Sequence, residues 1–200
     1  MRIVIIGVSG TIGQAVSQDL SGSHEIVGVA RTKGDYQVDL ASKESIQRLM
    51  ETVAPFDAVV CAAGQAKFGA LEALADEDFQ LSLSNKLMGQ INLVRVGLNY
   101  IRDHGSFTLT SGVLAREPIP GSAAISLVNA ALEGFVRAAA LEMPRGIRIN
   151  VVSPPWVSET LTAMGKDGSA GMPVAKVARA YVESVEGLLN GDAIDARGFA

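Results

Sequence analysis

Three glycines near the start of the chain have the spacing of a dinucleotide-binding turn. Gly7, Gly10 and Gly13 lie three residues apart, after the apolar run Ile3–Ile6 and at the start of the amphipathic segment Ile12–Leu20. A buried strand, a glycine turn and a helix N-terminus together present free backbone N–H groups and the positive end of a helix dipole, which hold a pyrophosphate. A tight strand-to-helix turn without a ligand is the alternative. The residues expected to bind the dinucleotide here are Gly7, Ser9, Gly10, Thr11, Ile12 and Gly13.

The residues after the second predicted strand indicate which dinucleotide binds. The apolar run Glu25–Ala30 is followed by Arg31 and Lys33. A guanidinium matches the geometry of a phosphate, so Arg31 favours NADP, unless both cations are merely solvated. Asp35 favours NAD instead, because it lies about 20 residues past the glycines, where a carboxylate bonds the ribose. Since Asp35 follows Gly34 in a predicted turn, we expect NADP rather than NAD.

The composition excludes several classes of protein. A net charge of -4 and a pI near 5.2 lack the basic face that nucleic-acid binding needs. A single cysteine, Cys61, excludes an internal disulfide, and two isolated histidines, His24 and His104, are expected at the surface, so we expect no metal site. The chain starts with a strand instead of a signal peptide, and no apolar run is long enough to span a bilayer. This predicts a cytoplasmic protein with no membrane contact.

Short apolar runs alternate with helical periods along the chain, which is typical of a doubly wound α/β sheet in a single domain over residues 1–200. The polar segment Ser158–Pro173 is rich in Gly, Ser and Met and is interpreted as a mobile lid or an ordinary surface loop. The expected strands are Ile3–Ile6, Glu25–Ala30, Tyr36–Asp39, Asp57–Cys61, Ser106–Thr110, Ile147–Val152 and Ala193–Ala196, and the expected helices are Ile12–Leu20, Ser42–Val53, Asp76–Asp103, Ser122–Met143 and Val174–Asn190.

Further motifs follow the third, fourth and sixth strands, namely Asp39-Leu40, Ala62-Ala63-Gly64 and Arg148-Ile149-Asn150-Val151-Val152-Ser153-Pro154. With the order of elements, they make nearly the whole chain resemble the short-chain dehydrogenase/reductase family. The resemblance implies a Rossmann-type, mainly parallel seven-stranded sheet of order 3-2-1-4-5-6-7 with helices on both faces. It also implies that Asp39 and Leu40 contact the adenine, that Ala62, Ala63 and Gly64 line its ribose, and that Pro154 and Val157 cover the nicotinamide.

The chain departs from this family at the catalytic residues. Family members use Asn, Ser, Tyr and Lys, and the tyrosine gives or takes the proton. Local alignment with the family puts Lys86, Gly112, Ile125 and Asn129 at these positions, in that order. Ser111 and Lys86 remain as candidate catalytic residues, although a turn-capping serine and a solvated lysine are the simpler interpretations.

Two classes of function follow from these residues. The first is an NADP-dependent oxidoreductase acting on a small carbonyl or alcohol, with a proton from Ser111, Lys86 or a water and little turnover of simple ketones, aldehydes and alcohols. The second is a non-enzymatic dinucleotide-binding sensor. A serine hydrolase is excluded because the chain has no Gly-x-Ser-x-Gly turn. A homodimer or homotetramer is expected, because the helices Asp76–Asp103 and Ser122–Met143 carry more apolar residues than one core face can use.

Overall fold

Strand β1 (Arg2–Ile6) lies inside the sheet of the computed structural model, which describes residues 1–199. It pairs in parallel with β2 (Glu25–Ala30) on one side and β4 (Phe56–Cys61) on the other. Ile3 and Ile5 pack on one face of the sheet, and Val4 and Ile6 on the other. All four side chains are buried, which explains why the strand is an unbroken apolar run.

The predicted sheet topology is confirmed. Within residues 1–199 the sheet has seven strands, all parallel, in the order β3-β2-β1-β4-β5-β6-β7. The chain direction across the sheet reverses between β1 and β4, so a crevice opens there at the carboxyl ends of the strands. The remaining strands are β3 (Tyr36–Gln37), β5 (Ile101–Thr110), β6 (Arg148–Ser153) and β7 (Ala193–Asp195).

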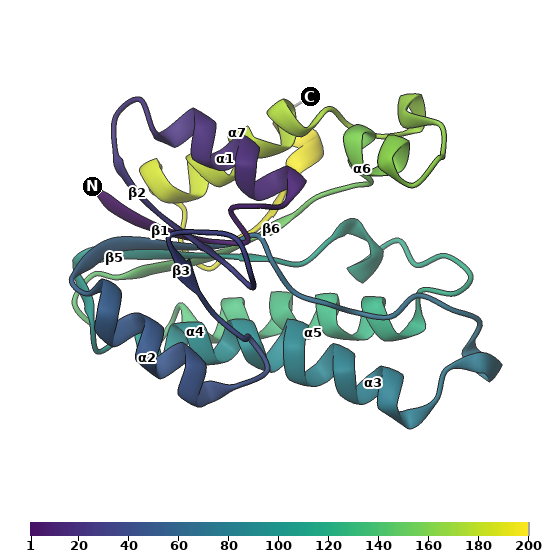
Figure 1. The fold of residues 1–200 in the computed structure, drawn as a ribbon, viewed down its shortest axis with the longest axis horizontal. Coiled ribbons are helices and arrows are strands. Elements are labelled where there is room, and N and C mark those ends of the chain that lie inside the picture. Colours follow the sequence, from purple (N-terminus) through teal and green to yellow (C-terminus); the bar gives the residue numbers. More distant parts are fainter. Residues whose placement is uncertain (200) are drawn as a thin grey trace.

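Helices cover both faces of the sheet (Figure 1). One layer holds α1 (Thr11–Leu20) and α7 (Val174–Glu186), which pack against each other. The opposite layer holds α2 (Lys43–Val53), α4 (Gly89–Gly97) and α5 (Ala123–Ala139). Each layer encloses its own apolar core, because side chains on alternate strand positions point to opposite faces.

The long helix expected at Asp76–Asp103 is present but ends earlier, at Gly97. It consists of α3 (Asp76–Ser82), a π-helical turn at Leu83–Met88, and α4, which follow one another without interruption. Strand β5 already begins at Ile101, which is buried and pairs with Phe56 of β4. This pairing ends the helix where helical periodicity alone would continue it.

Other element boundaries also differ from the expectation. The segment expected to be a loop at Ser158–Pro173 contains a helix, α6 (Ser158–Ala163), and a short 3-10 turn at Gly168–Ala170. A bridge between Val157 and Met172 ties the ends of this segment together, and both side chains are buried. The third strand ends at Gln37 instead of Asp39, α5 ends at Ala139 instead of Met143, and α7 ends at Glu186 instead of Asn190.

The two histidines line one cavity at the amino ends of the strands, on the far side of the sheet from the β1–β4 crevice. His104 is exposed, but the His24 side chain is only 12% exposed and lies 2.8 Å from Glu186, so its expected surface position is corrected. Among residues 1–199, no group of three His, Cys, Asp or Glu side chains is placed to hold a metal ion. None of the helices in that range is both long and apolar enough to cross a membrane.

Candidate functional site

The glycine turn after β1 is closely packed and ends on an uncapped helix. The N–H of Gly10 donates to the carbonyl of Gly7 at 2.9 Å, and Gly7 has a φ of +92°. A Cβ at Gly13 would overlap the Gly7 carbonyl, and one at Gly7 would lie 2.7 Å from the carbonyl oxygen of Ala62. No side chain caps α1 and no acidic residue lies in its first turn, so no side chain of the cap or of that turn neutralises the positive end of the helix dipole.

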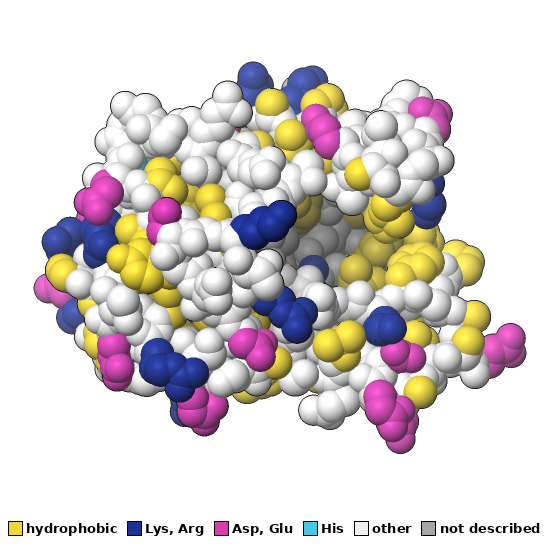
Figure 2. All heavy atoms as spheres, viewed as in Figure 1, with side chains coloured by type: hydrophobic (Ala, Val, Ile, Leu, Met, Phe, Trp, Pro, Cys, Tyr) yellow, Lys and Arg dark blue, Asp and Glu magenta, His cyan; other side chains and the backbone are white. Residues whose placement is uncertain are grey.

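A cavity of about 240 Å³ lies against this turn, and we call it the glycine-turn cavity. Figure 2 shows this side of the molecule with a deep hollow that has basic side chains at its edge and apolar side chains on one flank. Of the residues predicted to bind the dinucleotide at the turn, Thr11, Ile12 and Gly13 belong to the first turn of α1 and do not line the cavity. The lining residues are Ile6, Gly7, Ser9, Gly10, Ala30, Arg31, Val38, Asp39, Leu40, Ala62, Ala63, Gly64, Gln65 and Asn85.

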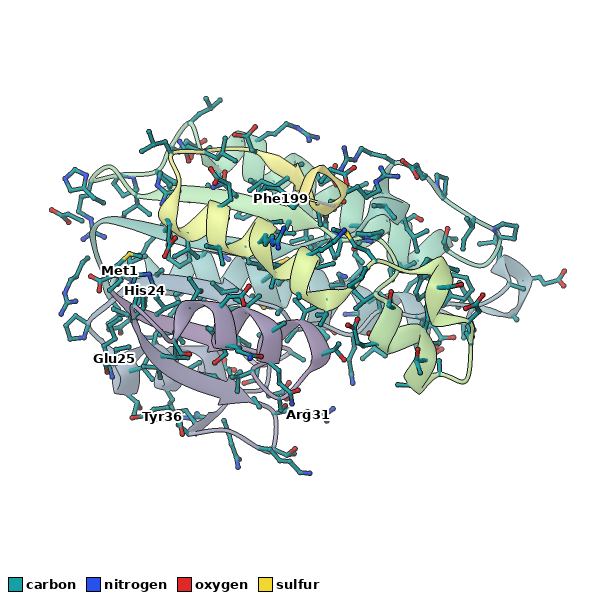
Figure 3. The ribbon with its side chains drawn as sticks, turned by 90° about the horizontal axis from the view of Figure 1, so that it is seen from above. Met1, His24, Glu25, Arg31, Tyr36 and Phe199 are labelled. Carbon is teal, nitrogen blue, oxygen red and sulfur yellow. The ribbon has the colours of Figure 1, made fainter. Side chains whose placement is uncertain are left out.

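Arg31 and Asp35 have different environments, although both follow β2. Arg31 is exposed at the rim of the glycine-turn cavity, at the end of β2 away from Met1 and His24 (Figure 3). The Asp35 carboxylate accepts the backbone N–H of Gly28 at 3.1 Å and does not line the cavity. The rim therefore presents a cation, and the competing carboxylate is bonded to the strand.

Gln65 and Asn85 line the glycine-turn cavity and are absent from the sequence prediction. The backbone N–H of Gln65 donates to Asn85 Oδ1 at 2.8 Å, which joins the loop after β4 to the π-helical turn. Their only sequence signal is that they adjoin Gly64 and Lys86, two residues that were predicted. Recognising the pair requires the contact between segments that lie about 20 residues apart.

Lys86 lies between two cavities. Its stem packs under the backbone of Gly64, and its Nζ donates to the carbonyl oxygen of Ser111 at 3.1 Å. The residue is half-buried, and desolvation of the ammonium lowers the pKa of Lys86 to about 8. At neutral pH the side chain is therefore still mainly an ammonium, but one that releases its proton more readily than a solvated lysine.

Ser111 is buried at the end of β5, and its hydroxyl already has a partner. Ser111 Oγ donates to Glu133 Oε1 at 3.2 Å, and Arg116 lies 3.6 Å from the other carboxylate oxygen of Glu133. The serine proton is thus directed to Glu133. Gln90 holds the strand end in place, because its amide accepts from Thr110 N at 2.8 Å and donates to Thr110 O at 2.9 Å.

A second cavity, of about 150 Å³, lies beyond Ser111, and we call it the Asn129 cavity. The positions that the alignment assigns to the family's serine, tyrosine and lysine, Gly112, Ile125 and Asn129, all line it, and so does Pro154. Val157 does not, because its side chain is buried in the bridge to Met172. The other lining residues are Ser111, Val113, Leu114, Pro155 and Trp156.

None of the chain's tyrosines lines either cavity. Tyr181 is buried under the sheet, where desolvation raises the pKa of its hydroxyl, and it lies 2.7 Å from Thr110 Oγ1. The Tyr100 hydroxyl accepts from Gln47 at 2.6 Å and donates to Glu51 at 3.3 Å. Tyr36 lies at the edge strand β3 (Figure 3). A tyrosine proton donor is therefore not available at these cavities.

Comparisons with known proteins agree on one family. The sequence model of a family described as enoyl-(acyl carrier protein) reductase matches residues 9–184. A 2,3-dihydro-2,3-dihydroxybenzoate dehydrogenase from Escherichia coli (strain K12) is 30% identical over 151 residues, covering 66% of this chain and 61% of that protein. A short-chain dehydrogenase/reductase from Stachybotrys chlorohalonatus is 30% identical over 225 aligned residues, covering 90% of this chain and 88% of that protein.

Solved structures have the same fold. A protein from Listeria innocua superimposes with a TM-score of 0.94 at 41% identity, and the match covers 98% of both chains. A small-chain dehydrogenase solved in complex with NADPH superimposes with a TM-score of 0.85 at 24% identity, covering 98% of this chain and 95% of that one.

Proposed function

The chain belongs to the short-chain dehydrogenase/reductase family, and we propose that it is an NADP(H)-dependent oxidoreductase acting on a small carbonyl or alcohol. One observation carries this proposal. The uncapped glycine turn opens into a cavity with Arg31 at its rim, while Asp35, which would favour NAD, bonds Gly28 instead.

The residues of the glycine-turn cavity fit NADP. The first N–H groups of α1, including those of Thr11, Ile12 and Gly13, would hold the pyrophosphate, because the glycines leave no side chain in the way. Arg31 would bond the 2′-phosphate. The adenosine would lie against the cavity wall formed by Asp39, Leu40, Ala62, Ala63 and Gly64.

Lys86 is the residue that we propose as proton donor. The bound nicotinamide supplies the hydride, and the proton must come from the chain or from water. Ile125 has no proton to give, and the Ser111 proton is directed to Glu133. The Lys86 ammonium bonds the backbone of Ser111 in the Asn129 cavity, and its neighbours Gly64 and Asn85 line the glycine-turn cavity. It is thus the proton source between cofactor and substrate.

A homo-oligomer formed through α5 is part of the proposal. The outward face of this helix carries mainly small apolar residues and one cation, Arg137, and Leu127 at its centre is 48% exposed. Such a flat face suits a close contact with a second copy. The exposed residues on it are Ala123, Leu127, Ala130, Gly134, Arg137 and Ala138.

Calorimetric titration with NADPH and with NADH tests the cofactor assignment. We expect NADPH to bind about tenfold more tightly or better, and Arg31→Ala to remove most of this preference, because a charge-assisted phosphate contact is lost. Arg137→Ala, at an exposed site on α5, is the matched control and should bind like the unmodified protein. Equal affinities for the two cofactors would overturn the assignment.

NADPH oxidation across a panel of carbonyl compounds tests the activity in the same preparation. We expect weak turnover of simple ketones and measurable turnover of a substrate that fits the Asn129 cavity. Tight NADPH binding with no oxidation by any carbonyl would favour the alternative of a dinucleotide sensor.

A further inference from the structure

Strands β4 and β5 separate at their carboxyl ends. Their pairing ends at Thr108 of β5, and the N–H of Ala62, the residue after β4, donates to β1 instead, at 2.8 Å. Further along the chain, Ser111 donates its N–H to β6 at 2.9 Å, so the N–H and the carbonyl of Thr110 point the other way, into the gap left by β4. Buried backbone groups of this kind need a partner from elsewhere in the fold.

Gln90 of α4 supplies that partner. Its side chain is fully buried, its Oε1 accepts the N–H of Thr110 at 2.8 Å, and its Nε2 donates to the carbonyl of Thr110 at 2.9 Å. A carboxamide carries both an acceptor and donors, so it can replace the peptide group of a neighbouring strand. Gln90 therefore fixes the backbone at the end of β5.

Lys86 reaches the same strand end from four residues earlier in the helix. Its Nζ donates to the carbonyl oxygen of Ser111 at 3.1 Å. Ser111 directly follows Thr110, the residue that Gln90 holds. The acceptor of the Lys86 ammonium is thus one peptide unit away from the backbone groups that Gln90 fixes.

The start of α4 is wedged between two backbone segments. A Cβ on Gly89 would lie 2.8 Å from the carbonyl oxygen of Leu40, so the helix cannot move closer to the loop after β3. On its other side, Gln90 bonds the end of β5. These two contacts fix the helical turn that carries Lys86 relative to the strand end.

We propose that Gln90 is a positioning residue for Lys86, because its carboxamide fixes the end of β5 and, with it, the carbonyl that holds the Lys86 ammonium between the two cavities. Gln90 has no proton to transfer and acts only through this backbone. The inference rests on the proposed function for one point alone, the role of the ammonium as proton donor.

The other titratable groups near Lys86 do not change in the variants below. Cys61 on β4 keeps its proton at neutral and mildly alkaline pH, because burial raises the pKa of its thiol to about 12. Glu133 on α5 accepts from the hydroxyl of Ser111 and pairs with Arg116. A change in the titration of Lys86 therefore reports on its own acceptor.

Gln90→Met keeps the side-chain length and removes both bonds to Thr110. The Lys86 stem stays packed against Gly64, so the ammonium remains desolvated but loses a well-placed acceptor, and its pKa should fall. Acetylation of Lys86 by acetic anhydride at a series of pH values, followed by peptide mass spectrometry, measures this without NADPH. We expect a midpoint about one pH unit lower than in the unmodified protein. An unchanged or raised midpoint in folded Gln90→Met would overturn the proposal.

Thr108→Val is the matched control for a general loss of stability. It removes the buried bond of 2.7 Å between Thr108 and Ser184, two residues earlier on β5, and should leave the Lys86 midpoint unchanged. An equal shift in both variants would mean that Gln90 only stabilises the sheet. If Gln90→Met does not fold, Gln90→Asn, whose carboxamide is one methylene short of Thr110, should lower the midpoint instead.

The pH profile of NADPH oxidation connects this position to the proposed function. In Gln90→Met the alkaline loss of activity should occur about one pH unit lower, while NADPH affinity changes little. A lower acetylation midpoint with an unchanged pH profile would support the positioning by Gln90 and contradict Lys86 as the proton donor. The two proposals can therefore fail separately.

Discussion

The two cavities on either side of Lys86 are lined by different kinds of residues. The glycine-turn cavity is lined by the segments after four strands, β1, β2, β3 and β4, and by Asn85, and the close contacts of its turn depend on glycines, which lack a side chain. The Asn129 cavity is made of side chains from α5 and from the segments after β5 and β6. A backbone-built site keeps its function when neighbouring side chains differ, whereas a side-chain-built site changes its chemistry with each residue. This explains how the chain combines a family-type dinucleotide turn with Gly112, Ile125 and Asn129 at the family's catalytic positions.

The largest expected effect concerns Lys86, which packs against Gly64 on the side of one cavity and bonds the backbone of Ser111 on the side of the other. Lys86→Met should reduce turnover by about a hundredfold to ten-thousandfold, the range for losing a general acid, while NADPH affinity changes little. Because the ammonium is the donor, the rate of NADPH oxidation by the unmodified protein should fall as the pH rises through about 8. Lys43→Met, at an exposed site of α2, is the control. A flat rate between pH 7 and pH 9 would contradict the role of Lys86.

Lys86→Met should stabilise the protein although it lowers the activity. The folded-state pKa of Lys86, about 8, lies below the ordinary value of 10.5. Burying the ammonium therefore lowers the free energy of unfolding, and this destabilisation is fully present below pH 8. That cost disappears as the pH rises towards 10.5. Lys86→Met should therefore raise the free energy of unfolding at pH 7 by on the order of 1 kcal/mol, since the residue is half-buried, and the gain should shrink in denaturant titrations at higher pH.

A smaller effect is expected from a methyl group in the glycine turn. Gly13→Ala places a Cβ against the Gly7 carbonyl, and overpacking of this kind costs about 1–3 kcal/mol of folding free energy. The turn must shift to relieve this contact, so we also expect a roughly tenfold loss of NADPH affinity. Calorimetry measures the loss of affinity. Gly22→Ala is a matched control, because a Cβ there meets nothing within 4 Å. If Gly13→Ala binds NADPH normally, the glycine-turn cavity is not a backbone-built site.

The smallest expected change is in assembly. Leu127→Glu places a charge on the outer face of α5, whose inner face contributes to the Asn129 cavity. The variant should be a monomer of 20.9 kDa, with a solution mass at least twofold lower than that of the unmodified protein. Light scattering at micromolar concentration measures this. Leu188→Glu, at a 93% exposed site after α7, should leave the mass unchanged. A monomer mass for the unmodified protein would contradict the homo-oligomer.

The positions of most strands and of the glycine turn were predictable because their signals are local, whereas the strand order was implied by the family resemblance. The run Ile3–Ile6 indicates a strand covered on both faces, and Gly7, Gly10 and Gly13 sit where a strand meets a helix. The π-helical turn inside the helix and its end at Gly97 were not predictable. The residues Leu83–Met88 have ordinary helical propensity, and the early start of β5 at Ile101 depends on pairing with Phe56, a residue far away in the chain.

The sequence by itself determined most of the strands, the glycine turn and the absence of a tyrosine–lysine pair, because periodicity, glycine conformation and residue identity are all properties of short segments. Only the tertiary structure decided what the remaining polar side chains do. It directed the Ser111 proton to Glu133, bonded Asp35 to Gly28, placed Lys86 against the backbone of Ser111 and left Asn129 Oδ1 without a partner. The physical reason is that a hydrogen bond or a desolvated charge depends on atoms from distant segments, and their distances exist only in the folded chain.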